Sequence, residues 1–383
     1  MSLRAAFVKH RYVASGGGER YLEWLLRGCA GRGHEVHVIT TGWPEGERSP
    51  WRVHAVPAAS GPAARRLRAF SRAAARQARE GGFDVTVSLE RTECQDVWRA
   101  GEGVHRVWLD RRRSFEPAWK VWLSRRTARQ RALLDLEAAA VARTPFVIAN
   151  SDLVRRDIES VYGGRHGRIA VIHNGVPADR FTLDARDAHR RDERARRGLG
   201  PDQPLLLFVG SGFRRKGLAE LLAALASLPD ARLIVLGRDP PGPWRAAAHR
   251  AGAAGRAAFD GTAADLVPLY HAADAVVLPT WFDSFSNVGL EAMRCGTPFV
   301  TTRFAGAHEL VRPGANGEVV ASPAAIGELA AAIRRAVEAG RAPGAAARIA
   351  ASVADFTMDR NVRMTLEVIE EAARQRAAAA RDR

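Results

Sequence analysis

Two carboxylates eight residues apart lie in one polar segment in the second half of the chain. Asp283 falls in a loop after an apolar run, and Glu291 falls in the helical stretch that follows. Ligands of parallel α/β sheets bind beyond the carboxyl ends of the strands, so both side chains are expected to face one crevice. Ser286, Asn287 and Val288 would add free backbone N–H groups at the helix start. The structural alternative is that Asp283 caps the helix and Glu291 pairs with an arginine.

A glycine-rich turn with three cations follows the apolar run at 205–209. It reads Gly-Ser-Gly-Phe-Arg-Arg-Lys-Gly over 210–217 and contains Gly212, Arg215 and Lys216. Glycines let backbone amides approach a phosphate, and a guanidinium beside an ammonium suits a pyrophosphate. Only three of the 58 cationic residues are lysines, which favours a specific role for Lys216 over a solvated basic turn.

A second glycine turn, Gly16-Gly17-Gly18, lies between the apolar run at 3–8 and an amphipathic helix. Backbone amides at such a strand-to-helix turn favour a bound anion. Glu19 fits a plain tight turn equally well, because an acid in the first helical turn complements the helix dipole. This turn alone therefore leaves both interpretations open.

An acid and an imidazole, Glu102 and His105, lie in the glycine-rich segment 101–105. They could move a proton or bind hydroxyl groups if this loop faces a crevice. The alternative is that they are ordinary polar loop residues. His173, which precedes Asn174-Gly175, is expected to make structural hydrogen bonds in a turn.

Short apolar runs alternate with Ala/Leu/Arg segments of helical period along the chain, which predicts two doubly wound α/β units with parallel sheets. We expect domains at 1–181 and 204–357, a charged linker at 182–203, and a C-terminal helix at 358–383 that could pack back on the N-terminal domain. The predicted strands lie near 3–8, 35–40, 83–89, 146–150, 168–172, 204–210, 231–237, 274–278 and 297–301, and the predicted helices of the second half near 216–228, 243–253, 289–295 and 323–340.

Composition limits the class of protein. A chain of 383 residues with 46% hydrophobic residues can form two cores and is not a disordered basic tail. Its three cysteines are far apart, which argues against a disulfide framework or a metal-type spacing. We see no signal peptide and no transmembrane run, so we expect a cytoplasmic protein. The net charge of +16 argues for an anionic partner or surface.

The densest charge coincides with tryptophans between Arg99 and Arg131, which we call the basic aromatic segment. It holds ten Lys/Arg against three acids, and four of the nine tryptophans lie in or beside it. Tryptophan prefers the headgroup level of a bilayer, and each cation near an anionic leaflet contributes ~1 kcal/mol. The segment predicts a membrane-docking surface, and the alternative is a helix over 117–142 with its tryptophans in the core. The docking residues would be Trp108, Arg111, Arg112, Arg113, Trp119 and Trp122.

Taken in order, these motifs resemble the family-4 glycosyltransferases of the GT-B fold. The resemblance rests on Gly16 to Gly18, Arg-Gly-His-Glu-Val at 32–36, His-Asn-Gly-Val at 173–176 with Arg180-Phe181, Arg215-Lys216-Gly217, and the Asp283/Glu291 segment. Within the family, 99–105 and 210–218 look most like the bacterial lipopolysaccharide core glucosyltransferases that act on heptose. The family pattern is Glu-x7-Glu, whereas this chain has Asp283, one methylene shorter, at the first position.

The resemblance implies two Rossmann-like domains that face a central cleft, with a UDP-sugar donor held mainly by the second domain and the acceptor by the first. Family members retain the anomeric configuration and need no metal, and we find no Asp-x-Asp pair here that could bridge a diphosphate through Mg²⁺. No cofactor is expected. The implied donor contacts are Glu291 to the ribose and Asp283 to the sugar 3- and 4-hydroxyls. The pyrophosphate would be bound by Arg215, Lys216 and Gly212, by the amides of Ser286, Asn287 and Val288, and by Gly17 and Gly18 from the first domain. The candidate catalytic residues are Glu102, His105 and Asp283.

The expected function is transfer of a hexose, with glucose favoured, from a UDP-sugar to a lipopolysaccharide core heptose at the cytoplasmic face of the membrane. One alternative is a family-4 enzyme that uses another nucleotide sugar to build an exopolysaccharide or glycolipid. A basic nucleic-acid-binding protein would also fit the charge, but the sequence shows no recognised binding module, so no nucleic-acid partner is expected. A phosphorylase that depends on pyridoxal phosphate is not favoured, because its Schiff base would need one of the only three lysines in the chain.

Overall fold

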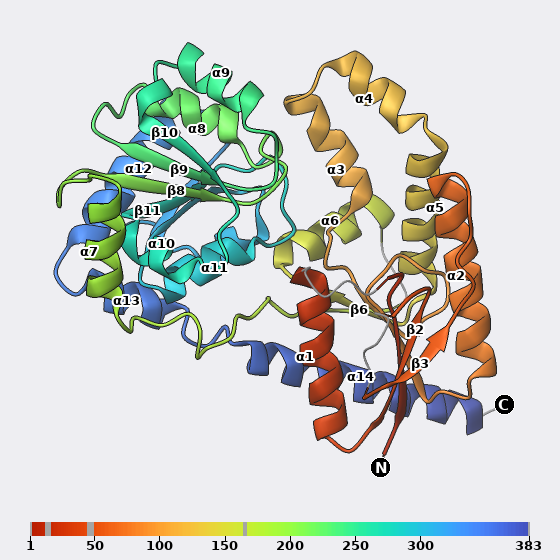
Figure 1. The fold of residues 1–383 in the computed structure, drawn as a ribbon. Helices are drawn as coiled ribbons and strands as arrows, with labels where there is room; N and C mark the ends of the chain where they lie inside the picture. The colour runs from red at the N-terminus through yellow and green to blue at the C-terminus, as the bar shows by residue number, and fades with distance from the viewer. Residues whose placement is uncertain (1, 12–16, 44–49, 164–166, 382–383) are drawn as a thin grey trace. The chain divides into compact units, whose positions relative to one another are not determined.

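The computed structural model describes residues 2–11, 17–43, 50–163 and 167–381 and divides the chain into two compact units (Figure 1). The first unit comprises Met1–His173 with Met358–Arg383, and the second comprises Asn174–Thr357. Each unit contains one parallel sheet with helices packed against it. No described helix is both long enough and apolar enough to cross a bilayer.

The first unit is built on a seven-stranded sheet in the order β3-β2-β1-β4-β5-β6-β7, with every pairing parallel. Strands β1 and β4 are almost wholly buried, as expected for a parallel sheet covered on both faces. The strands are β1 (Arg4–Val8), β2 (Glu35–Thr40), β3 (Arg52–Ala55), β4 (Val85–Ser88), β5 (Val97–Arg99), β6 (Phe146–Ala149) and β7 (Arg168–Val171). The helices are α1 (Gly17–Gly31), α2 (Ala63–Glu80), α3 (His105–Arg111), α4 (Ala118–Arg125), α5 (Ala128–Arg143), α6 (Asp152–Tyr162) and α14 (Met358–Arg381).

The second unit has a six-stranded parallel sheet in the order β10-β9-β8-β11-β12-β13. The strand order reverses between β8 and β11, and in doubly wound sheets such a reversal opens a crevice beyond the carboxyl ends of the two strands. The strands are β8 (Leu205–Val209), β9 (Arg232–Leu236), β10 (Ala257–Gly261), β11 (Ala275–Leu278), β12 (Phe299–Thr302) and β13 (Gly317–Val320). The helices are α7 (Arg186–Arg196), α8 (Leu218–Leu225), α9 (Gly242–Arg250), α10 (Val267–Ala272), α11 (Asn287–Arg294), α12 (Ile326–Arg341) and α13 (Ala345–Ser352).

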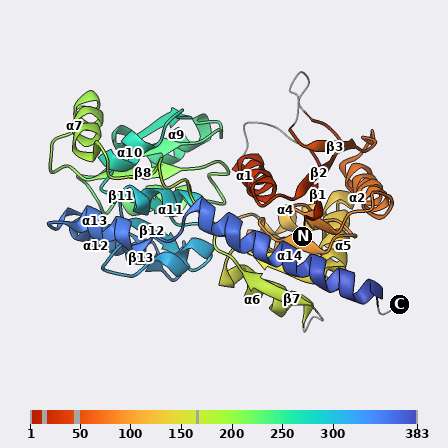
Figure 2. The same ribbon diagram turned by 90° about the horizontal axis from the view of Figure 1, so that it is seen from below.

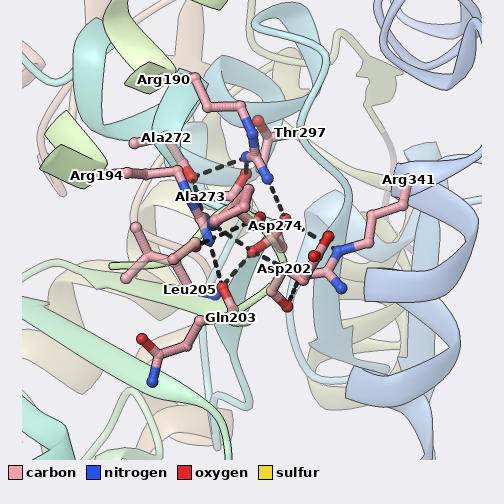
Figure 3. A network of polar contacts seen from close by, with 12 residues as sticks. Arg190, Arg194, Asp202, Gln203, Leu205, Ala272, Ala273, Asp274, Thr297 and Arg341 are labelled. Carbon is pink, nitrogen blue, oxygen red and sulfur yellow. Dashed lines mark hydrogen bonds and ion pairs between the residues drawn. The ribbon is translucent and has the colours of Figure 1, made fainter. Parts of the chain in front are cut away.

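The charged stretch 182–203, which we expected to be a linker, instead belongs to the second unit and contains α7. Helix α7 is bound to the rest of the unit through Asp274, which lies next to β11 and is 5% exposed (Figure 3). Arg190 donates to Asp274 Oδ1 at 2.6 Å, and Arg194 donates to Oδ2 at 3.2 Å. Arg341 adds a third guanidinium 3.4 Å from Oδ2. The inner face of α7 is therefore held by ion pairs, which hydrophobic periodicity cannot reveal.

Asp274 is ionised in this setting. Burial opposes its charge, but Arg190 and the amide of Leu205, which donates to Oδ2 at 2.8 Å, hold the pKa of Asp274 below its ordinary value. Removing one partner of a buried ion pair leaves an uncompensated charge. Because its ion pairs with Asp274 attach α7 to the second unit, the stretch 182–203 is part of that unit. The domain boundary falls at His173 and Asn174 rather than within 182–203.

The helix expected at 358–383 is α14, which packs in the first unit alongside α1 (Figures 1 and 2). Its apolar face adds Val362, Leu366 and Ile369 to the core that contains the inner face of α1. Gly28 allows the close approach, because a Cβ at that position would lie 2.4 Å from Cγ1 of Val362. The first unit is thus assembled from both ends of the chain.

Candidate functional site

Two loops of the second unit, one after β8 and one after β11, are fixed to each other. Gly217 makes this possible, since its φ is +79° and a Cβ would lie 1.9 Å from the carbonyl oxygen of Pro279. The carbonyl of Arg215 accepts hydrogen bonds from the Trp281 amide at 2.9 Å and from Thr280 Oγ1 at 3.0 Å. The loops that carry the predicted cations and carboxylate therefore form one structural piece.

Lys216 and Asp283 form an ion pair at the join of these loops. Lys216 Nζ donates to Asp283 Oδ2 at 2.6 Å, and Arg215 Nη1 lies 3.9 Å from the same oxygen. Lys216 is only 8% exposed. Burial opposes the charge on Asp283, but Lys216 and Arg215 outweigh that effect and hold its pKa below the ordinary value. Asp283 is therefore ionised at neutral pH, and the ammonium of Lys216 and the carboxylate of Asp283 suit an anion and a hydroxyl respectively.

The start of α11 lies beside this pair and has an unusual backbone. Ser286 has a φ of +77°, a left-handed conformation that costs a non-glycine residue on the order of 1–3 kcal/mol. Its hydroxyl is buried without a hydrogen-bond partner among the described residues. Asn287 is exposed and accepts a hydrogen bond from Asn174 Nδ2 at 2.7 Å. Such strained, polar backbone at a helix start is typical of binding sites.

Glu291, on the same helix, is fixed by a residue that the sequence analysis did not find. Tyr270, on α10, is fully buried and donates its hydroxyl to Glu291 Oε2 at 2.7 Å. Burial and the neighbouring carboxylate raise the pKa of Tyr270 far above its ordinary value, so the hydroxyl remains a donor. Tyr270 therefore sets the orientation of Glu291.

The amide of Gly212 already has a carboxylate partner. Asp239, which follows β9, accepts from Gly212 N at 2.7 Å and from Phe213 N at 3.2 Å. A phosphate could reach the Gly212 amide only by displacing Asp239. The same contact holds the glycine turn in its conformation, in which Gly212 has a left-handed φ of +79°.

In the first unit, Glu102 and His105 belong to one polar network. Glu102 is mostly exposed and forms an ion pair with Arg91. His105 begins α3, is 9% exposed, and its Nε2 lies 2.5 Å from Oε1 of Gln130. Burial lowers the pKa of His105, so the imidazole is neutral near pH 7. Gly17 and Gly18, the other residues expected to contribute from this unit, are the first two residues of α1.

Glu137 lies at the centre of this network, and the sequence analysis did not find it. Its side chain is fully buried and accepts from Arg91 Nε at 2.9 Å, the His105 amide at 2.6 Å and the Tyr162 hydroxyl at 2.7 Å. Arg91 in turn donates to the carbonyl of Gly103 at 2.9 Å. Glu137 thus fixes the loop that carries Glu102 and His105. The signal available in the sequence was an acid at an inward-facing position of an apolar helix.

His173 lies at the end of the first unit, where its carbonyl accepts from Asn361 Nδ2 at 2.6 Å. This is a structural hydrogen bond, of the kind expected there. Among the described residues, no group of three or more His, Cys, Asp or Glu side chains is arranged to bind a metal ion.

The basic aromatic segment forms α3, α4 and the start of α5, with a break before Ala128 where Thr127 caps α5 through Gln130 N at 3.3 Å. Trp119 and Trp122 are 64% and 55% exposed, so the alternative of one long helix with its tryptophans in the core is wrong. Leu123, at 57%, extends the exposed apolar face. Cations lie close by, with Arg126 3.7 Å from the Trp122 ring centroid.

The other predicted docking residues are less accessible. Arg112 donates to both carboxylate oxygens of Glu116, at 2.9 and 2.6 Å, and to Ser124 at 2.8 Å. Arg111 and Trp108 are half-buried, whereas Arg113 is exposed. Any docking surface in this segment would therefore centre on α4 and Arg113.

Two family models match the chain, Glycosyltransferase Family 4 over residues 15–180 and Glycosyl transferases group 1 over residues 203–339. Lipopolysaccharide glucosyltransferase WaaG of Escherichia coli (strain K12) is 27% identical over 339 residues, which cover 87% of this chain and 89% of that protein. D-inositol 3-phosphate glycosyltransferase of Mycobacterium sp. (strain KMS) is 36% identical over 193 residues, 48% of this chain. The match covers 43% of that relative, so it spans less than half of its length.

Solved structures share the architecture. The crystal structure of WaaG, a glycosyltransferase involved in lipopolysaccharide biosynthesis, aligns with a TM-score of 0.79 at 24% identity over 95% of this chain and 99% of that one. Anabaena Alr3699/HepE in complex with UDP-glucose aligns with a TM-score of 0.68 at 20% identity over 98% of this chain and 100% of that one. These similarities identify the fold as GT-B, as the sequence predicted.

Proposed function

Because this chain belongs to the family-4 glycosyltransferases, we propose that it transfers a hexose, with glucose favoured, from a UDP-sugar to a lipopolysaccharide core heptose. The observation that carries the proposal is the buried ion pair between Lys216 and Asp283. Lys216 lies on the turn after β8, and Asp283 lies in the loop between β11 and α11, the helix that carries Glu291. A relative whose match covers 87% of the chain is named a lipopolysaccharide glucosyltransferase. A structure of similar fold holds UDP-glucose.

In this proposal each polar group of the second unit has one task. Glu291, oriented by Tyr270, accepts hydrogen bonds from the ribose. Lys216 and Arg215 neutralise the charge that grows on the diphosphate as the sugar leaves, which is the role a metal ion has in other enzymes. Asp283 accepts from hydroxyls of the sugar. The reaction proceeds with retention and without a metal ion.

The first unit binds the acceptor. It carries 36 Lys/Arg against 23 Asp/Glu, a net charge of +13, while the second unit carries 22 against 19, a net charge of +3. A phosphorylated acceptor would be attracted to the more basic unit. Glu102 and His105, held by Arg91 and Glu137, are the candidates for contact with the reacting sugars.

Binding of UDP in the presence of EDTA tests the donor part of this proposal. UDP at a hundred times its Kd should stabilise the protein by about 2.7 kcal/mol, which thermal unfolding detects as a higher Tm. UMP is the matched control, because it lacks the second phosphate that Lys216 and Arg215 would bind. A Tm increase that appeared only with added Mg²⁺ would contradict the metal-free mechanism.

We further propose that α4 docks the protein on the cytoplasmic face of an anionic membrane. Trp119, Trp122 and Leu123 lie three and four residues apart and so share one face of the helix. Replacing all three with alanine should release the protein from vesicles that contain phosphatidylglycerol, as measured by cosedimentation, because the apolar contact is lost. Trp24→Ala is the control, since Trp24 is a partly exposed tryptophan on another helix. Undiminished binding of the triple variant would place the docking surface elsewhere.

A second candidate function keeps the chemistry and changes the substrates. The match to D-inositol 3-phosphate glycosyltransferases, at 36% identity over about half of the chain, supports a different nucleotide sugar or a smaller phosphorylated acceptor. Donor hydrolysis across a panel of nucleotide sugars would separate the two candidates.

A further inference from the structure

The two sheets reverse their strand order at equivalent places, and the reversal in the first unit also carries an ion pair between a lysine and a carboxylate. Strand β1 lies between β2 and β4, just as β8 lies between β9 and β11. Lys9 directly follows β1, and Glu90 is the second residue after β4. Lys9 Nζ lies 2.9 Å from Glu90 Oε1. This pair occupies the place in its sheet that the pair of Lys216 and Asp283 occupies in the sheet of the second unit.

The carboxylate of Glu90 is held in place by the loops around it. Its Oε1 also accepts from the amide of His10 at 3.4 Å. The amide of Glu90 donates to Ser88 Oγ at 3.1 Å, and Ser88 Oγ donates to the Glu90 carbonyl at 2.9 Å. The side chains of Lys9 and Glu90 are 17% and 25% exposed. In doubly wound sheets ligands bind in the crevice beyond such a reversal, so the pair is fixed in advance and within reach of a ligand.

Lys9 also acts on Glu102, the acid proposed to contact the reacting sugars. Desolvation opposes the charge on Glu102, but Arg91 and Lys9 outweigh it and hold the pKa of Glu102 below its ordinary value. Arg91 also pairs with Glu137. The network therefore holds three carboxylates, those of Glu90, Glu102 and Glu137, against two cations. A phosphate would meet excess negative charge there, whereas sugar hydroxyls can donate to a carboxylate and accept from an ammonium.

We propose that Lys9 and Glu90 form the subsite for the acceptor sugar, in which Glu90 accepts from one hydroxyl and Lys9 donates to the neighbouring one. The inference rests on the proposed function and deepens it, because it assigns the acceptor by uncharged vicinal hydroxyls. A heptose offers such hydroxyls. The phosphate that the net charge of the first unit attracts would then lie outside this subsite.

Acetylation of amines on the full chain tests the assignment, since Lys9, Lys120 and Lys216 are its only lysines. A dephosphorylated core oligosaccharide that ends in heptose should slow the acetylation of Lys9, as measured by mass spectrometry. UDP should slow the acetylation of Lys216. Lys120, which is exposed on α4, is the internal reference and should react at the same rate throughout.

Substitution of the pair gives an independent readout. Lys9→Met and Glu90→Gln should each raise the KM for the same oligosaccharide about 10- to 10²-fold with little change in kcat, because a lost hydrogen bond to a charged group removes uniform binding. The controls are Arg32→Met and Glu370→Gln, which break an ion pair of similar exposure in the same unit, near the amino end of β2. The control variants should keep the acceptor KM of the unmodified protein.

Three outcomes would overturn the proposal. Protection of Lys9 only by a phosphorylated oligosaccharide would assign the pair to an anion. No protection, or an unchanged acceptor KM in both variants, would make the pair a structural link between β1 and β4. Equal losses of transfer and of donor hydrolysis would place the pair in the donor site.

Failure of the proposed function would look different. If UDP leaves the acetylation of Lys216 unchanged, the donor site is wrong, whatever happens at Lys9. If the unmodified protein transfers no sugar to the heptose oligosaccharide, the proposed acceptor is wrong and the subsite proposed for it is wrong as well.

Discussion

Replacing Lys216 with alanine is expected to lower the rate of glycosyl transfer by ~10²- to 10³-fold, the loss seen when one group that stabilises transition-state charge is removed. Lys216 is buried and already paired with Asp283, so its ammonium is held in place before the reaction. Initial rates at saturating donor would measure the effect. Arg214→Ala is the matched control, because it removes an exposed cation from the same turn.

The same variant has a consequence for stability. The pKa of Asp283 is lowered by Lys216, so the ion pair stabilises the fold above the ordinary pKa of an aspartate and loses that contribution as pH falls through the lowered value. The stability difference between the unmodified protein and Lys216→Ala should therefore be largest near neutral pH and shrink in acid. Equal rates for the Lys216 and Arg214 variants would place Lys216 outside the reaction.

Asp283→Asn should reduce transfer by about 10- to 10²-fold while leaving UDP affinity intact, because a charged acceptor to a sugar hydroxyl is worth about 1.5–3 kcal/mol and UDP has no sugar. The structure sharpens this expectation. Loss of the aspartate charge frees the Lys216 ammonium, so UDP affinity should hold or increase. Isothermal titration with UDP and rate measurements on the same variant would measure both quantities.

Glu291→Ala is the counterpart of that substitution. Glu291 is assigned to the ribose, so its loss should weaken UDP itself and reduce the preference for UDP over 2′-deoxy-UDP. Asp283→Glu, which restores the side-chain length of the family pattern, should retain more transfer than Asp283→Asn. Similar losses of UDP affinity in the Asp283 and Glu291 variants would refute this division of labour.

The sequence predicted the central strands of both sheets well. The expected strand at 35–40 is β2 with the same bounds, and the strand at 3–8 is β1 within one residue. Strands β3, β5, β10 and β13 were missed because they are short or lie at a sheet edge. They lack the continuous Val/Ile run that marks a strand buried on both faces. The edge strand β7 was predicted, near 168–172, because it contains an Ile-Ala-Val run at 169–171 that the missed strands lack.

The contacts between residues of the candidate site were harder to predict than the residues themselves. Lys216 and Asp283 were both singled out, but they are 67 residues apart, and only the adjacency of β8 and β11 brings them together. Tyr270, Glu137 and Asp239 hold candidate residues from positions that look like ordinary core or loop. Their roles depend on which helix or loop lies opposite, and local sequence does not contain that information.

The position of α14 links folding to the order of synthesis. Domains generally fold as units while the chain emerges from the ribosome, the N-terminal one first. Here the apolar face of α1, with Leu22, Leu25 and Leu26, shares its core with Val362, Leu366 and Ile369, which are synthesised only after the whole second unit. The second unit can therefore be complete while the first still exposes an unfilled core. A chain that stops after Thr357 is therefore expected to keep the second unit and to lose the fold of the unit that is translated first, because the core of that unit is completed only by residues beyond Thr357.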